Sequence, residues 1–179
     1  MAWYAGIYRP ERVDKLVVIN APHPGAYQRA ALTSTQLLRS YYVYLFQLPL
    51  LPEAISRLTI GQALRSTAYV PGAFPDEALD VYRNGIAQPG AATAMINYYR
   101  SAFRYVLTRG HAPGVNGMVA RPTMLVWGMQ DFALTPQLTY DLDRWVPGIR
   151  VQRMHDSGHW APEEQPRLTG DLLMGFLGG

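Results

Sequence analysis

The chain has 179 residues, 49% of them hydrophobic and 16% charged, which suffices for one globular domain with a buried core and excludes a disordered chain. It has no cysteine, which excludes disulfides and thiolate metal sites and agrees with a reducing, cytoplasmic compartment. The formal charge of +3 comes from scattered arginines and a single lysine, so we expect no nucleic-acid partner.

The first residues predict a helix followed by a buried strand. Residues 1–8 are apolar and aromatic, and Pro10 closes this run because proline disfavours the helical conformation in the residue before it. No Ser, Thr, Asp or Asn precedes the run as a cap, so we expect the helix to start upstream of Met1. Residues 15–20 contain Leu-Val-Val-Ile, which is typical of a parallel strand buried on both faces. Residues 21–25, Ala-Pro-His-Pro-Gly, then end the strand.

Residues 25–114 show helical periodicity and few strand signals. Scattered prolines interrupt the pattern, so the sequence predicts an inserted set of four or five helices, including one from Asp76 and one over residues 91–107. The most apolar run, residues 41–51, is well short of the roughly 20 residues that a membrane helix needs. The chain also begins without a signal-peptide pattern. We therefore expect a soluble protein with no membrane partner.

The alternation of strands and helices resumes in the last third of the chain. Residues 123–127 predict a buried strand, and residues 149–154 repeat the pattern. A helix is expected over residues 135–145, with a Thr-Pro pair at its start, and a last helix over residues 166–177. The fold class is therefore α/β, with a parallel sheet of about three strands, flanking helices and an inserted helical segment. The expected division is core in 1–24 and 115–179, with the helical insertion in 25–114.

Two candidate catalytic side chains follow the two later strands. Asp131 comes just after residues 123–127, and His159 follows residues 149–154 in a glycine-containing loop. Ligand chemistry in a parallel sheet gathers beyond the carboxyl ends of the strands, so Asp131 and His159 can converge there. An acid that orients an imidazole is the supporting half of a nucleophile, base and acid triad. The alternatives are an ordinary turn aspartate and a loop histidine without a role.

Several motifs together resemble the epoxide hydrolase branch of the α/β-hydrolase family. Residues 9–24 are similar to the helix and strand that follow the nucleophile in that branch and run into its lid. Residues 127–134, Trp-Gly-Met-Gln-Asp-Phe-Ala-Leu, are similar to its acid loop, and Gly-His-Trp at 158–160 with Glu-Gln-Pro at 164–166 is similar to its histidine loop. The resemblance spans essentially the whole chain and implies the C-terminal half of an α/β-hydrolase sheet.

Two further motifs lie in the helical segment, which corresponds to the family's lid. Tyr42 stands four residues before the Phe of a Phe-Gln-Leu-Pro motif at 46–49, as the first lid tyrosine does in the family. Tyr99 lies in Asn-Tyr-Tyr-Arg at 97–100, which matches the family motif that carries the second tyrosine. Without the resemblance, both tyrosines would be interpreted as packed helix aromatics.

The resemblance implies a two-step hydrolysis with a role for each of these residues. An Asp attacks an epoxide carbon to form an alkyl-enzyme ester, and His159 then activates a water that hydrolyses the ester to a diol. An imidazole suits this role because its unperturbed pKa is about 6.5. Asp131 would hold the tautomer of His159, while Tyr42 and Tyr99 would donate hydrogen bonds to the epoxide oxygen. Tyr41 and Tyr98 precede them by one residue and are natural controls.

One essential part of this machinery is absent from the sequence. Family members carry the nucleophilic Asp in a Gly-x-Asp-x-Gly elbow and an oxyanion motif upstream of it, and neither occurs between Met1 and Gly179. We therefore expect the isolated chain to be inactive. The strand at residues 15–20 would also show an unpaired apolar edge, which favours self-association or pairing with a complementary chain.

The sequence implies no cofactor and no metal. His155 and His159 stand four residues apart, but Ser157-Gly158 disfavours the helix that would bring both rings to one face. The expected partners are a small apolar epoxide, suggested by the Tyr, Leu, Phe and Met content of the lid, and water.

Three alternatives remain open at this point. A related haloalkane or haloacid dehalogenase would use the same His and acid, but its relatives usually stabilise halide with indole N–H donors that include one from the lid, and residues 25–114 contain no Trp. A serine esterase on the same fold would not need the tyrosine pair. A non-catalytic truncated fragment that pairs with a complementary chain is an alternative of another class.

Overall fold

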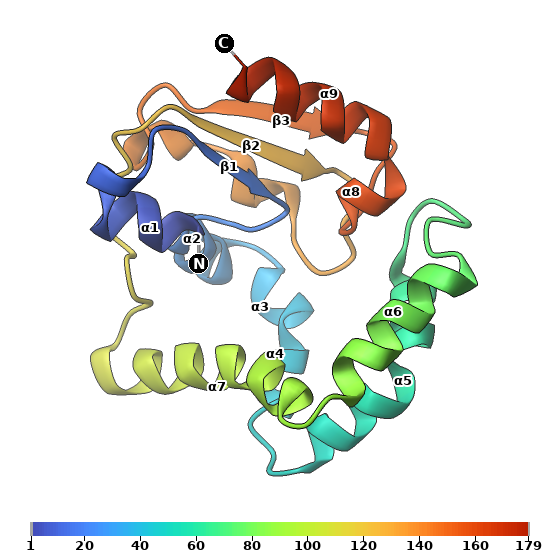
Figure 1. The fold of residues 1–179 in the computed structure, drawn as a ribbon. Helices are drawn as coiled ribbons and strands as arrows, with labels where there is room; N and C mark the ends of the chain where they lie inside the picture. The colour runs from blue at the N-terminus through green and yellow to red at the C-terminus, as the bar shows by residue number, and fades with distance from the viewer. Residues whose placement is uncertain (1, 179) are drawn as a thin grey trace.

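Three parallel strands form the sheet of this computed structural model, which describes residues 2–178 (Figure 1). β1 (Leu16–Ile19) and β3 (Arg150–Met154) flank β2 (Thr123–Gly128) in the order β1-β2-β3. The register places Leu16 of β1 opposite Thr123 of β2. Every residue of β2 is buried, as expected for the central strand of a parallel sheet. All three strands therefore end at the same edge of the sheet.

Helices cover both faces of the sheet. α1 (Ala2–Tyr8) and α2 (Pro24–Thr33) pack on the face where Leu125 and Trp127 of β2 are buried. α9 (Pro166–Leu177) covers the opposite face, where Met124, Val126 and Phe176 form a second cluster (Figure 1). Successive side chains of β2 thus point alternately into the two layers, as the strand period of two requires.

Six helices lie between β1 and β2 in the described chain, and we call residues 24–109 the helical segment. Its members after α2 are α3 (Gln36–Arg39), α4 (Tyr41–Leu45), α5 (Leu51–Thr67), α6 (Asp76–Ala87) and α7 (Ala91–Arg109). α5 and α6 form a hairpin that reaches toward α8 (Ala161–Glu164), while α7 runs below the sheet in the view of Figure 1. The remaining elements are the short 3-10 helices η1 (Pro10–Arg12), η2 (Pro136–Thr139) and η3 (Leu142–Arg144).

Most of the predicted elements are confirmed. The α/β class, the three parallel strands and the flanking helices all agree with the sequence analysis, and α6, α7 and α9 begin at the predicted residues. The predicted four or five inserted helices are six, because short α3 and α4 are separate helices. β1 pairs with β2 alone among the residues that the structure describes, so its other edge carries no strand partner there.

In the last third of the chain one predicted helix is wrong, and one predicted strand is present as β3 but is less buried than expected. The helix expected over residues 135–145 is broken into η2 and η3, because Asp141 has a φ of 49° and Arg29 donates to the carbonyl oxygens of Gln137 and Tyr140 (3.3 and 2.5 Å), which a continuous helix would use internally. Within the strand predicted at residues 149–154, only Met154 of β3 is buried, because β3 lies at the margin of the described sheet.

No helix within residues 2–178 combines the length and the apolar content that a bilayer span requires.

His23 connects β1 to α2 and is fully buried between two indole rings. Its ring centroid lies 5.2 Å from that of Trp3 and 5.3 Å from that of Trp145. Its Nδ1 accepts a hydrogen bond from the N–H of Gly25 (3.1 Å), which caps the start of α2. Burial lowers the pKa of His23 from 6.5 to about 4, and the backbone of Gly117 opposes that shift.

This burial predicts a loss of stability in mild acid. Between about pH 6.5 and the folded pKa of about 4 the unfolded chain binds the proton more strongly than the folded chain, so the free energy of unfolding falls as the pH is lowered through this window. The total loss is about 3 kcal/mol. Urea denaturation across this pH range should show a steeper pH dependence in the wild type than in His23→Asn, which retains a capping oxygen but does not titrate. Equal pH dependence in both proteins would contradict this assignment.

Candidate active site

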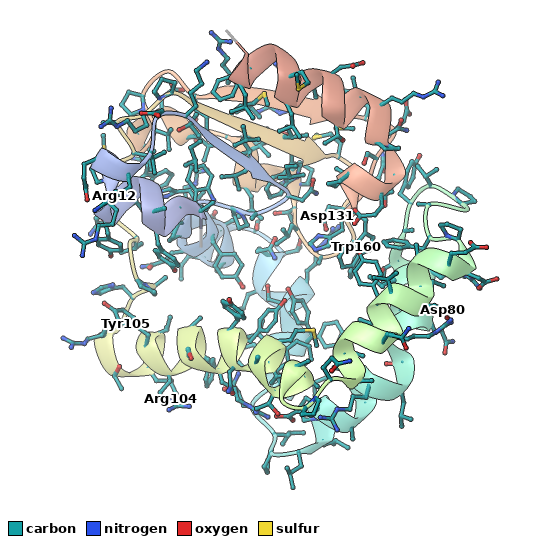
Figure 2. The ribbon with its side chains drawn as sticks, viewed as in Figure 1. Arg12, Asp80, Arg104, Tyr105, Asp131 and Trp160 are labelled. Carbon is teal, nitrogen blue, oxygen red and sulfur yellow. The ribbon has the colours of Figure 1, made fainter. Side chains whose placement is uncertain are left out.

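Asp131 lies just past the end of β2 and is almost fully buried. Its Oδ1 accepts hydrogen bonds from the backbone N–H groups of Ala133 (2.8 Å) and Leu134 (2.9 Å), as aspartate does in tight turns. These two bonds fix the orientation of the carboxylate and leave Oδ2 for partners outside the turn. Asp131 lies on the side of the sheet that faces the helical segment (Figure 2).

His159 binds the remaining carboxylate oxygen. Its Nδ1 lies 2.7 Å from Asp131 Oδ2, and its side chain is 25% exposed. Because an ionised carboxylate only accepts hydrogen bonds, Nδ1 carries the proton and Nε2 presents its lone pair. The imidazole contacts the rings of Phe132 and Trp160, with centroids 5.4 and 4.7 Å away. The pair can therefore take up a proton at Nε2 and stabilise the imidazolium that forms.

Glycines bring the two loops of this pair together. We call residues 129–135 the acid loop and residues 155–160 the histidine loop. A Cβ added to Gly128 would lie 2.0 Å from the carbonyl oxygen of Gly158, so only glycine fits at the end of β2. The N–H of Gln130 donates to the carbonyl oxygen of Ser157 (2.9 Å), which holds the loops side by side.

Asn20, at the end of β1, connects the first strand to both loops. Its Nδ2 donates to Asp131 Oδ2 (2.8 Å) and to the carbonyl oxygen of Gly158 (3.2 Å), while its Oδ1 accepts from the N–H of Gly128 (3.0 Å). Its backbone has a φ of 42°, a left-handed conformation that asparagine tolerates better than most residues. The buried amide thus fixes the oxygen that holds His159.

The helical segment also holds the acid loop. Gln36 of α3 is fully buried, and its amide donates to the carbonyl oxygen of Ala133 (2.9 Å) and accepts from the N–H of Thr135 (2.9 Å). Arg39, one turn later on the same helix, donates to the carbonyl oxygen of Asp131 (3.0 Å). The position of the acid therefore depends on α3 as well as on the sheet.

Tyr42 of α4 and Tyr99 of α7 meet edge to face, with ring centroids 5.7 Å apart and an interplanar angle of 81°. Burial raises the pKa of Tyr42 well above its usual value, and the neighbouring Tyr99, Tyr27 and Asp131 add to the shift. Burial likewise raises the pKa of Tyr99, with a contribution from Tyr27. Both phenols are therefore protonated donors at neutral pH, and Tyr42 is close enough to Asp131 to be affected by its charge.

Arg100 links the chain around Tyr42 to the chain around Tyr99. Its guanidinium donates to the carbonyl oxygens of Phe46 (2.9 Å) and Leu48 (2.7 Å) and forms a two-point ion pair with Glu53, at 2.5 and 3.1 Å. The hydrogen bond from Arg100 is the main cause that lowers the pKa of Glu53. Phe46, held in this way, packs against Tyr99 with ring centroids 4.9 Å apart. The motifs around the two tyrosines are thus parts of one contact.

Comparisons with known proteins identify the family. A sequence profile described as alpha/beta hydrolase fold matches residues 1–166. The chain belongs to the α/β-hydrolase fold family. Among solved α/β-hydrolases, an epoxide hydrolase from Bacillus megaterium in complex with an inhibitor superposes with a TM-score of 0.81 at 24% identity, covering 99% of this chain and 65% of that one. At this level of identity the likeness shows the fold.

Several sequence relatives are named epoxide hydrolases. Epoxide hydrolase 3 from Mus musculus is 35% identical over 185 residues, which cover 99% of this chain and 48% of the relative. Epoxide hydrolase 4 from Homo sapiens is 32% identical over 187 residues, 99% of this chain and 50% of the relative. The chain thus spans about half the length of these curated relatives.

The α/β-hydrolase chain brings its predicted site residues together in two pairs. Asp131 contacts His159, and Tyr42 contacts Tyr99, whereas Tyr41 and Tyr98 are 64% and 65% exposed. Sequence reasoning missed the side chains that hold the acid, which are Asn20, Gln36 and Arg39. Asn20 could be noticed as a polar residue at the end of a buried strand, but no spacing in the sequence indicates the partners of the other two.

The hydrogen bonds around Asp131 predict a change of tautomer in Asp131→Asn. The N–H groups of Ala133 and Leu134 should keep the amide oxygen in the place of Oδ1, so the amide NH₂ would replace Oδ2 and face His159 Nδ1 as a donor. Nitrogen-15 NMR of the imidazoles should therefore show the Nδ1–H tautomer in the wild type and the Nε2–H tautomer in the variant. The exposed His155 is an internal control, and an unchanged tautomer of His159 would refute the arrangement.

Proposed function

We propose that this chain carries the base, the orienting acid, the oxygen-binding phenols and the lid of an epoxide hydrolase. The observation that carries the proposal is the pairing of two half-buried phenols, Tyr42 and Tyr99, near an Asp131–His159 pair. In this proposal residues 25–114 form the lid over a core made of residues 1–24 and 115–179. The relatives named epoxide hydrolases support the same assignment.

The first step opens the epoxide ring. A nucleophilic aspartate, supplied from outside these 179 residues in a Gly-x-Asp-x-Gly elbow, attacks an epoxide carbon as the bond from that carbon to the ring oxygen breaks. Tyr42 and Tyr99 donate hydrogen bonds to the ring oxygen, and one of them gives it a proton. Donors placed where charge develops lower the barrier, and a buried site strengthens the effect. In this proposal the chain needs that aspartate for turnover.

The second step releases the diol. His159 Nε2 takes one proton from a water molecule, whose oxygen attacks the carbonyl carbon of the ester. The bond to the alkyl oxygen then breaks, this oxygen leaves with the second proton of that water, and the aspartate is regenerated as a carboxylate. Asp131 stabilises the imidazolium through the hydrogen bond at Nδ1. The proton on His159 then restores the phenol that was used in the first step, so the cycle balances with one water added.

The alternatives fit less well. A dehalogenase would need an indole donor from its lid, and residues 25–114 contain no Trp. A serine esterase would leave the phenol pair without a role.

We propose a small apolar epoxide and water as the substrates, because aromatic and aliphatic side chains dominate the segment that would cover the site. We also propose a cytoplasmic location, and pairing of the open edge of β1 with the chain that supplies the nucleophile.

The test of the phenols uses a protein in which the upstream half of an epoxide hydrolase is fused to, or co-expressed with, this chain. Diol formation from an aryl epoxide should fall by about 100-fold or more in Tyr42→Phe/Tyr99→Phe, because the developing alkoxide loses both donors. Tyr41→Phe/Tyr98→Phe, which changes the exposed neighbours, should remain close to the wild type. Equal loss in both double variants would argue against the assigned role.

The test of the base uses His159→Gln in the same assembly. The ester should form but persist, because water is no longer activated, so mass spectrometry of the intact protein should show an adduct equal to the mass of the epoxide. Absence of that adduct, with the phenols intact and the epoxide consumed, would count against the two-step mechanism.

A further inference from the structure

Glu164, at the end of α8, is a buried carboxylate whose partners come from two parts of the fold. It is 5% exposed. Its Oε2 accepts from the hydroxyl of Ser157 (3.0 Å) and from the N–H of Gly158, both in the histidine loop. Its Oε1 accepts from the N–H of Tyr69 (3.0 Å), in the connection between α5 and α6. These three hydrogen bonds offset the free-energy cost of burying the charge of the carboxylate.

The end of α5 and the connection that follows it also contact the histidine loop beyond His159. The indole N–H of Trp160 donates to the hydroxyl of Thr67 (3.0 Å), and the Trp160 ring meets that of Phe74 edge to face, with centroids 5.9 Å apart. Trp160 lies beside the α5–α6 hairpin in Figure 2. Residues 67–74 of the helical segment therefore bind Trp160 directly and bind Ser157 and Gly158 through Glu164.

We propose that Glu164 is a positioning residue that couples the docking of residues 67–74 to the placement of His159 beside Asp131. When residues 67–74 move away, Oε1 loses its donor in a buried place, and the carboxylate turns toward water. The N–H of Gly158 is then released, and the imidazole of the next residue loses its alignment with the acid. The inference rests on the proposed function only in taking His159 as the base.

Space around Gly158 supports a tight coupling. A Cβ at this position would lie 3.0 Å from the Cβ of Tyr69 and 3.1 Å from Glu164 Oε1. There is therefore little room for a side chain between Gly158, Tyr69 and the carboxylate. Its carbonyl oxygen accepts from Asn20 Nδ2 (3.2 Å), the same amide that holds Asp131. A shift of Gly158 is thereby transmitted to the acid as well as to the base.

The test compares Glu164→Gln with Glu163→Gln in the 179-residue chain. Glutamine at position 164 replaces one carboxylate oxygen by an NH₂ group, which cannot accept from the N–H or O–H donors. The Glu163 side chain accepts from the exposed hydroxyl of Tyr82 (2.9 Å), and its link to the histidine loop is a backbone hydrogen bond to the carbonyl oxygen of Trp160, which Glu163→Gln leaves in place. Hydrogen exchange of the Tyr69 and Gly158 amides should accelerate together by about tenfold or more in Glu164→Gln. The Nδ1–H signal of His159 should broaden in the same variant, and Glu163→Gln should match the wild type in both readouts.

Two results would overturn the inference. One is faster exchange of the Tyr69 and Gly158 amides with an unchanged His159 signal, which would make Glu164 a structural residue only. The other is identical behaviour of the two glutamine variants. If Glu164→Gln does not fold, Ser157→Ala removes one donor to Oε2 and should change both readouts in the same direction by less, and no change would again overturn the inference. None of these readouts needs turnover, so failure of the coupling is distinguishable from failure of the proposed function.

Discussion

The site depends on one carboxylate oxygen, Oδ2 of Asp131, which binds His159 Nδ1 at 2.7 Å and Asn20 Nδ2 at 2.8 Å. Through these two bonds, side chains that follow all three strands of the sheet converge at one atom. A buried carboxylate is stable only where donors surround it, and the turn N–H groups of Ala133 and Leu134 supply the others. The same donors that make burial of the charge tolerable therefore orient the imidazole.

The helical segment is part of this arrangement. α3 holds the acid loop through Gln36 and Arg39, and the α5–α6 connection holds the histidine loop through Glu164. The phenols of Tyr42 and Tyr99 come from the same segment. One segment that holds both loops and carries both phenols can position all four side chains together, as the proposed reaction requires.

Local patterns in the sequence predicted the strands, the long helices and the positions of Asp131 and His159, because buried strands and glycine turns have strong local signals. The tyrosine pair required the family resemblance, since its spacing alone also fits packed helix aromatics. The helix expected over residues 135–145 failed because a distant side chain, Arg29, takes its carbonyl groups. Asn20, Gln36 and Arg39 act through partners about a hundred residues away, and a single sequence does not record such contacts.

The central claim is that the Asp131–His159 pair and the Tyr42–Tyr99 pair act on the same bound molecule. The most direct test is a crystal structure of the assembled His159→Gln enzyme with its ester trapped. The hydroxyl derived from the epoxide oxygen should lie within hydrogen-bond distance of both phenols, and the ester carbonyl should face residue 159. An ester whose hydroxyl points away from Tyr42 and Tyr99, or whose carbonyl lies out of reach of residue 159, would contradict it.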